Sequence, residues 1–133
     1  MSQLSADDRL AIQDAIARYA HALDASEWDD FRALFTDDCR LDLGPMGVFE
    51  GAAGVRRFTD MMGSMGLTMR HFVTNIVVTG ESDRAQAKVY VLAFTGEPGA
   101  QRPATGRYAD ELVKRGGRWL FQHRRVVIDV PKQ

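Results

Sequence analysis

The sequence changes character at Leu67, and this division restricts the possible folds more than any other feature. Before it, apolar residues recur at helical spacing, and after it four β-like runs follow one another. The segments "GESD", "GEPGAQRPAT" and "RGG" separate these runs and have the composition of turns. The expected strands are residues 69–79, 84–95, 106–114 and 118–130. Helices followed by consecutive antiparallel strands indicate an α+β fold.

The first part of the chain is expected to contain three helices. Ser5 is a candidate N-cap for the first, whose apolar stripe ends beside Asp24. A short helix is expected within residues 28–35 and a third within 51–65. The segment "CRLDL" alternates like a strand. The stripe of the first helix consists of Ile12, Ile16, Tyr19 and Leu23.

Four long strands are expected to form a twisted, curved sheet, and the helices are the elements that can cover one of its faces. Short helices fill such a curve incompletely, so a concave cavity of the kind that binds small molecules is expected. Polar side chains that point into this cavity are the candidates for chemistry.

Length and composition exclude several classes of protein. The 133 residues, 45% of them hydrophobic, suit one domain spanning 1–133. Seventeen basic and eighteen acidic residues, without a basic run, give no sign of a nucleic-acid partner. No stretch approaches the roughly 18 apolar residues of a membrane span, and the start does not resemble a signal peptide. The single cysteine, Cys39, cannot form an internal disulfide. A cytoplasmic location is therefore expected.

His71 is the strongest candidate for a catalytic base. Free histidine has a pKa of about 6.5, which suits proton transfer at neutral pH. In "LTMRHFVTNIVV", His71 alternates with Val73, Asn75 and Val77, and this mixed face suits a cavity wall. The opposite face, which carries Phe72, is more uniformly apolar and is interpreted as the structural side. The alternative is a core histidine that is hydrogen-bonded to the backbone.

Asp24 is the best candidate for the partner that orients such a base. It ends the first helix at the edge of the apolar stripe, where a carboxylate interacts unfavourably with the helix dipole. Its alternative interpretation is a turn residue. Tyr19 on the stripe could hydrogen-bond a substrate oxygen or be a core aromatic residue. His21 is expected on a solvated face, and the side on which His123 lies is left open.

Several further residues could line the cavity. Trp28 could be a core residue or a pocket residue. Methionines such as Met61 and Met65 suit either packing or an adaptable apolar wall. The histidine spacing predicts no metal site, and no nucleotide-binding motif or nucleophile elbow is present, so no cofactor is expected.

Four segments of the chain carry a wider pattern: "AIQDAIARYAHALDASEWDDFRALFTDDCRLD", "GVFEG", "RHFVTN" and "GRYADELVKRGGRWLFQHRRVVID". Their most specific motifs are "Y-x4-D-x3-W-D" and "G-x-Y-x-D-x9-W". Together they resemble the SnoaL-like branch of the nuclear-transport-factor-2-like superfamily over nearly the whole chain. The resemblance implies a cone-shaped fold in which a curved antiparallel sheet wraps around the N-terminal helices and a deep apolar pocket.

The resemblance also implies roles for particular residues. The branch is similar to scytalone dehydratase, bile-acid 7α-dehydratase and lindane dehydrochlorinase, in which an Asp and a His form a dyad. Asp24 and His71 match those positions, and Tyr19 matches a tyrosine found in the bile-acid dehydratase. Arg124 falls near an arginine used in that dehydratase and in the dehydrochlorinase, with a one-residue ambiguity toward Arg125.

Departures from the scytalone dehydratase pattern argue against scytalone as the substrate. Leu43 stands where that enzyme has a tyrosine, and Tyr108 where it has an asparagine. Together with the resemblance, these residues suggest a cofactor-independent lyase whose small or medium apolar substrate resembles a steroid, terpenoid or aromatic polyketide. The proposed substrate contacts are Trp28, Asn75, Tyr108, Met61 and Met65. The alternatives are an isomerase or cyclase with the same dyad and a non-catalytic binding or assembly module.

Self-association as a homodimer or homotrimer is also expected. One face of a long curved sheet would otherwise expose apolar residues such as Val89 or Leu92.

Overall fold

The computed structural model describes residues 3–131, in which three α-helices precede the four long strands. The α+β class is confirmed. In chain order the elements are α1 (Ala6–Asp24), α2 (Trp28–Arg32), β1 (Phe35–Asp42), the 3-10 helix η1 (Gly44–Met46), β2 (Val48–Glu50), α3 (Gly51–Met65), β3 (Thr68–Glu81), β4 (Arg84–Gly96), β5 (Arg102–Arg115) and β6 (Arg118–Val130).

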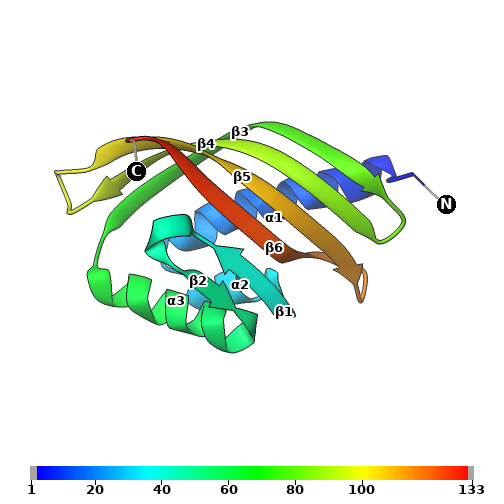
Figure 1. The fold of residues 1–133 in the computed structure, drawn as a ribbon, viewed down its shortest axis with the longest axis horizontal. Helices are drawn as coiled ribbons and strands as arrows, with labels where there is room; N and C mark the ends of the chain where they lie inside the picture. The colour runs from blue at the N-terminus through cyan, green and yellow to red at the C-terminus, as the bar shows by residue number, and fades with distance from the viewer. Residues whose placement is uncertain (1–2, 132–133) are drawn as a thin grey trace.

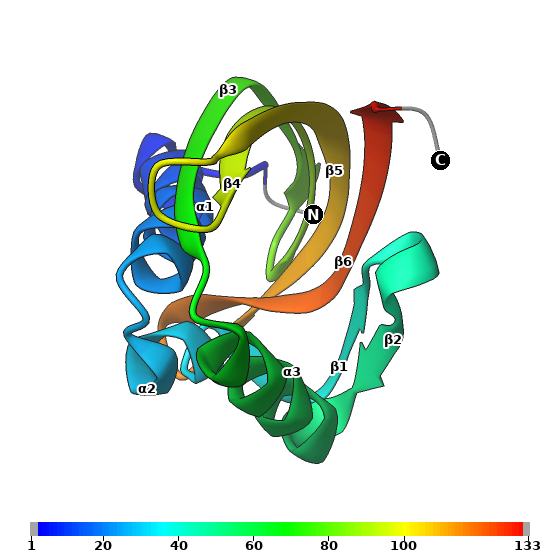
Figure 2. The ribbon, with the colours of Figure 1, turned by 90° about the vertical axis from the view of Figure 1, so that its left-hand side faces the viewer.

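All six strands belong to one sheet with the order β2-β1-β6-β5-β4-β3. From β3 to β6, each strand pairs antiparallel with its neighbour in sequence, as predicted. The parallel pairing of β1 with β6 was not predicted. The sheet curls strongly without closing, and the helices lie toward its open side (Figures 1 and 2). Helix α1 packs against β3, and α3 packs against β1 and β2.

Two elements differ in length from the prediction. Helix α2 ends at Arg32, and Phe35 already begins β1. Strand β5 begins at Arg102, four residues before the expected start. In both cases strand pairing extends into residues that were expected elsewhere, Phe35 in a helix and residues 102–105 in a turn.

Helix α1 is fixed to the rest of the fold at both of its ends. At its start, the Ser5 side chain accepts a hydrogen bond from the backbone N–H of Asp8, which confirms Ser5 as the N-cap. The Asp8 carboxylate accepts bonds from Trp119 Nε1 at 3.0 Å and Lys114 Nζ at 3.1 Å. At the other end, Asp24 lies beside β3. The C-terminal end of α1, which carries Asp24, is therefore held at a defined place on the sheet.

A β-bulge interrupts β3 after Thr74. The pairing with β4 shifts between Thr74 and Val77, so that Asn75 and Ile76 both lie opposite Val89. Asn75 has a φ of 53°, and asparagine tolerates this left-handed conformation better than most residues. The extra residue reverses the alternation of side chains beyond it.

Two predictions about β3 are wrong, and the bulge accounts for the first of them. Asn75 and Val77 are exposed, whereas Val78 is buried on the same side as His71. Phe72, interpreted as a residue of the structural side, is 52% exposed, because its face of β3 is the outer one. The polar side chain of Asn75 is therefore not a part of the cavity wall.

The outer face of β3 and β4 exposes a group of large apolar side chains. Phe72, Tyr90, Leu92 and Phe94 are all exposed, and the rings of Phe72 and Phe94 lie 6.3 Å apart. Leu92 is thus exposed as predicted, but Val89 is buried because it points to the inner face. Self-association through such a face stays a prediction. In residues 3–131, no helix is long and apolar enough to cross a membrane.

Candidate active site

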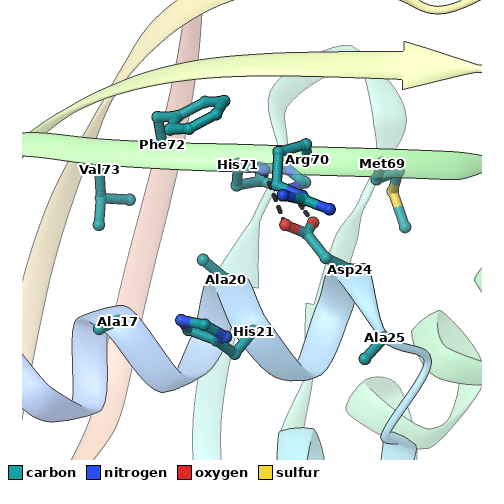
Figure 3. Close-up of a pocket in the computed structure, with 10 residues that line it drawn as sticks. All are labelled: Ala17, Ala20, His21, Asp24, Ala25, Met69, Arg70, His71, Phe72 and Val73. Carbon is teal, nitrogen blue, oxygen red and sulfur yellow. Dashed lines mark hydrogen bonds and ion pairs between the residues drawn. The ribbon is translucent and has the colours of Figure 1, made fainter.

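Asp24 and His71 contact each other where the end of α1 meets β3 (Figure 3). Asp24 Oδ1 lies 2.6 Å from Nδ1 of His71, and Asp24 Oδ2 accepts a 2.8 Å hydrogen bond from the backbone N–H of His71. The two side chains are only 13% and 12% exposed. The contact that the sequence predicted is therefore present.

The two hydrogen bonds fix both the carboxylate and the plane of the imidazole. A carboxylate beside Nδ1 favours the tautomer that carries its proton on Nδ1, which leaves Nε2 as the acceptor. The charge of Asp24 would also stabilise an imidazolium formed at His71. The pair therefore has the geometry of an oriented general base.

A groove of about 480 Å³ lies between α1 and β3 along one side of this pair (Figure 3). The alanines of α1 leave room there, and the exposed side chains of His21 and Arg70 add polar groups. Both Asp24 and His71 line the groove. Water can therefore reach the pair from the surface.

His71 also lines a separate, mainly apolar cavity of about 230 Å³. Residues of α1, α3, η1 and the inner face of β3 to β6 line this cavity, and two of them, Met46 and Met65, are half exposed. Among its polar groups are the His71 imidazole and the hydroxyl-bearing side chains of Tyr19 and Tyr108. Its apolar lining includes Leu23, Leu43, Met46, Phe58, Met62, Met65, Ala93, Ala104, Val126 and Ile128.

Two buried tyrosines, Tyr19 and Tyr108, line this cavity. Their ring centroids are 5.9 Å apart. Burial raises the pKa of Tyr19, and burial together with the neighbouring Tyr19 raises the pKa of Tyr108. Both hydroxyls therefore keep their protons at neutral pH. They can donate hydrogen bonds to a ligand oxygen but are poor donors of a complete proton.

Arg124 is completely buried, whereas Arg125 is exposed, so the ambiguity between them is resolved. Its Nε and Nη2 donate to the two carboxylate oxygens of Asp110, each at 2.7 Å. Its guanidinium carbon lies 4.3 Å from the ring centroid of Tyr19 and 4.0 Å from that of Tyr108. The guanidinium is thus held between a carboxylate and aromatic rings.

Arg124 is not among the residues that line the cavity, so the expected direct contact with substrate is corrected to a contact with the two tyrosines. Burial opposes its charge, but the Asp110 carboxylate outweighs that effect and raises the pKa of Arg124. A permanent positive charge therefore lies beside the tyrosine rings.

Three expected substrate contacts lie outside the cavity. Asn75 is exposed at the bulge, where the left-handed backbone turns its side chain outward. Trp28 packs its ring against α3, since a Cβ added at Gly63 would come within 3.3 Å of its Nε1. Met61 packs against the core and is absent from the cavity lining. Met65 lines the cavity, as expected.

Three residues at or near the site, Asp110, Ala93 and Ala104, were not predicted from the sequence. Asp110 stands two residues after Tyr108, so strand alternation alone could have placed both on the same face. The alanines carry no polar group, and no local signal identified them as cavity residues. Within residues 3–131, no three side chains of His, Cys, Asp or Glu are grouped as metal ligands.

Comparisons with known proteins agree with this architecture. A protein from Novosphingobium aromaticivorans, provisionally named an aromatic ring hydroxylase, is 32% identical with a TM-score of 0.83, covering 97% of this chain and 94% of that chain. A provisionally named scytalone dehydratase from the same organism is 24% identical with a TM-score of 0.84, covering 93% and 85%. LinA is 22% identical with a TM-score of 0.84, covering 92% and 86%.

The last two likenesses show a shared fold and no more, because both identities are below 25%. A search of curated proteins gave no significant match. A sequence model of the SnoaL-like domain matches residues 5–125. With this match over most of its length, the chain belongs to the SnoaL-like family.

Proposed function

We propose that this protein is a cofactor-independent lyase of the dehydratase type that acts on a small apolar molecule. The observation that carries the proposal is the double contact of Asp24 with His71 at the border of an apolar cavity. A base that is oriented by a carboxylate and adjoins a cavity suits the removal of a carbon-bound proton. The name of one fold neighbour, a provisional scytalone dehydratase, agrees with this class.

In the proposed reaction, His71 Nε2 takes a proton from a carbon next to a carbonyl group. The electron pair of the C–H bond forms an enolate and then a carbon–carbon double bond as the β-hydroxyl group leaves. The imidazolium returns the proton to the departing hydroxyl, which is released as water. Asp24 stabilises the imidazolium between these two steps.

The tyrosines would bind the oxygen on which negative charge develops. Tyr19 and Tyr108 both keep their protons, so they would donate hydrogen bonds to the carbonyl oxygen as it becomes an enolate. The charge of Arg124, in contact with both rings, would hold them in place and favour the developing anion. Arg124 is accordingly proposed as a positioning residue.

The test is the loss of water from a panel of β-hydroxy ketones, followed by the ultraviolet absorbance of the enone product. Wild type should accelerate the reaction, and His71→Ala should lose about 10²–10⁴-fold of the rate, the usual contribution of a positioned base. Full activity in His71→Ala would contradict the assignment of the base. Product analysis on the same panel separates a dehydratase from an isomerase or cyclase with the same dyad.

A non-catalytic binding or assembly module is the second candidate. The 32% identical relative is named as an aromatic ring hydroxylase rather than as a lyase, so the shared fold does not by itself fix the function. Binding of a β-hydroxy ketone in the cavity without any turnover would support this second candidate against the first.

A further inference from the structure

Two alanines lie in one row with His71 across the inner face of the sheet. In the strand register, His71 of β3 is directly opposite Ala93 of β4, and Ala93 is directly opposite Ala104 of β5. All three residues line the apolar cavity. The space beside the base is therefore bounded by two methyl groups.

On β3 and β4 the rows on either side carry larger side chains, whereas on β5 the residue opposite Val91 is Gly106. Met69, two residues before His71, is opposite Thr95, and Val73, two residues after it, is opposite Val91. Although Ala93 and Ala104 point inward, they remain partly accessible, whereas Val91 is buried. On β4 the alanine row is thus a hollow between Val91 and Thr95, located next to the imidazole.

The size of the cavity sets a range for the ligand. An apolar cavity of about 150 Å³ holds benzene, and pockets for drug-sized ligands are about 300–1,000 Å³. The cavity here, at about 230 Å³, lies between these values. It suits a ligand larger than benzene and smaller than four fused rings.

We infer that Ala93 and Ala104 set the substrate size, admitting a carbonyl compound of one or two rings beside His71 and excluding a four-ring steroid. The carbonyl in this inference rests on the proposed function, whereas the size limit rests on strand register and cavity volume. The sequence suggested steroid, terpenoid and aromatic polyketide-like substrates. The proposed size limit excludes the steroids from this group.

Three ketones of increasing size test the inference on the full chain: cyclohexanone, 2-tetralone and androst-4-ene-3,17-dione. Each is titrated into the protein while the ring signals of His71 are followed by NMR, with His71→Asn used to assign them. Cyclohexanone and 2-tetralone should shift these signals, and the steroid should leave them unchanged. Steroid binding as tight as that of 2-tetralone, or no binding of any ketone, would overturn the inference.

Leucine substitutions test the role of the row itself. Ala104→Leu and Ala93→Leu should weaken 2-tetralone binding about tenfold or more, because the added side chain occupies the hollow. Ala109→Leu is the matched control, since Ala109 is on the same strand as Ala104 but is exposed on the outer face. Thermal melting checks that each variant folds, and valine replaces leucine where it does not.

Equal affinity for 2-tetralone in wild type and in both folded row variants would show that the alanines do not set the size limit. This result is distinct from failure of the proposed lyase activity. A protein that binds the small ketones with the predicted size limit but turns over no β-hydroxy ketone would contradict the activity and leave the size limit intact.

Discussion

The carboxylate of Asp24 contacts both the ring Nδ1 and the backbone N–H of His71, so one aspartate holds the imidazole and the strand that carries it. Because Asp24 also binds the backbone N–H of His71, its carboxylate stays beside β3 whichever rotamer the His71 side chain adopts. It also ties the end of α1 to β3, the strand at one edge of the sheet. The candidate base is consequently oriented by the fold before any ligand binds.

Asp24→Asn should therefore reduce turnover much more than it reduces stability. The amide cannot stabilise an imidazolium by charge, and its NH₂ group can favour the wrong tautomer of His71. In a well-studied triad the equivalent change costs about 10⁴-fold in kcat, so a loss of about 10²–10⁴-fold is expected. The rate of enone formation on the β-hydroxy ketone panel measures it.

The control for this variant is Asp30→Asn, which removes an exposed carboxylate from the neighbouring helix α2. Its activity should match wild type. Asp24→Asn with wild-type kcat would mean that the carboxylate is structural, and urea unfolding of both variants would show by how much.

The two cavity tyrosines predict a particular behaviour at alkaline pH. Burial raises the folded-state pKa of Tyr19 and Tyr108 above the unfolded value of about 10. A raised pKa contributes stability that is complete below the unfolded pKa and is lost as pH rises through the folded one. The stability of wild type should thus fall as the pH is raised above about 10.

Urea unfolding from pH 8 to pH 11 checks this prediction, with absorbance at 295 nm reporting tyrosinate. The double variant in which Tyr19 and Tyr108 become phenylalanine should lose less stability over this range than wild type. An equal loss in both proteins would show that other groups cause the alkaline decline. On activity, each single phenylalanine variant should lower kcat by about 10-fold to 10³-fold if its hydroxyl binds the developing oxyanion.

The Asp24–His71 contact was predictable because both residues carry a local signal. The stripe of α1 identifies Asp24 as an edge residue at the helix end, and His71 interrupts an apolar strand. The bulge in β3 was not predictable, because the same local sequence is compatible with a left-handed or an extended backbone at Asn75. For the same reason alternation gave the correct side of β3 before Thr74 and the wrong side after it.

Contacts between strands that are distant in sequence were harder to predict. Asp110 meets Arg124 across β5 and β6, whose pairing shifts at a bulge between Glu111 and Leu112. The row of His71, Ala93 and Ala104 likewise depends on the register of three strands. Register is fixed by the whole sheet, so no single segment of sequence contains it.

Arg124 and Asp110 predict a large and non-additive effect on stability. Both side chains have no exposed surface, so removal of one leaves the other charged and buried. Arg124→Met or Asp110→Leu alone should cost about 3–5 kcal/mol in the free energy of unfolding. The double variant should cost less than the sum of the two, because it leaves neither charge unpaired.

A double-mutant cycle by urea unfolding measures this coupling. Arg107 and Asp129 supply the control pair, because they form an ion pair on the exposed side of β5 and β6. Their cycle should give a coupling of about 1 kcal/mol or less. Additive effects at Arg124 and Asp110 would contradict the interpretation that the pair is a single buried unit.

Asp8 predicts the behaviour of the protein in acid. Hydrogen bonds from Trp119, Lys114 and Ser5 hold the pKa of its carboxyl well below the usual range. A depressed pKa contributes stability that is present above the unfolded value of about 3.9 and is lost as pH falls through the folded one. Asp8→Asn should therefore be less stable than wild type near neutral pH, and the difference should shrink in acid.

Urea midpoints from pH 6 to pH 2 measure this difference, with the exposed neighbour Asp7→Asn as the matched charge control. A gap between wild type and Asp8→Asn that stays constant over this range would show that the carboxylate does not link α1 to the sheet through its charge.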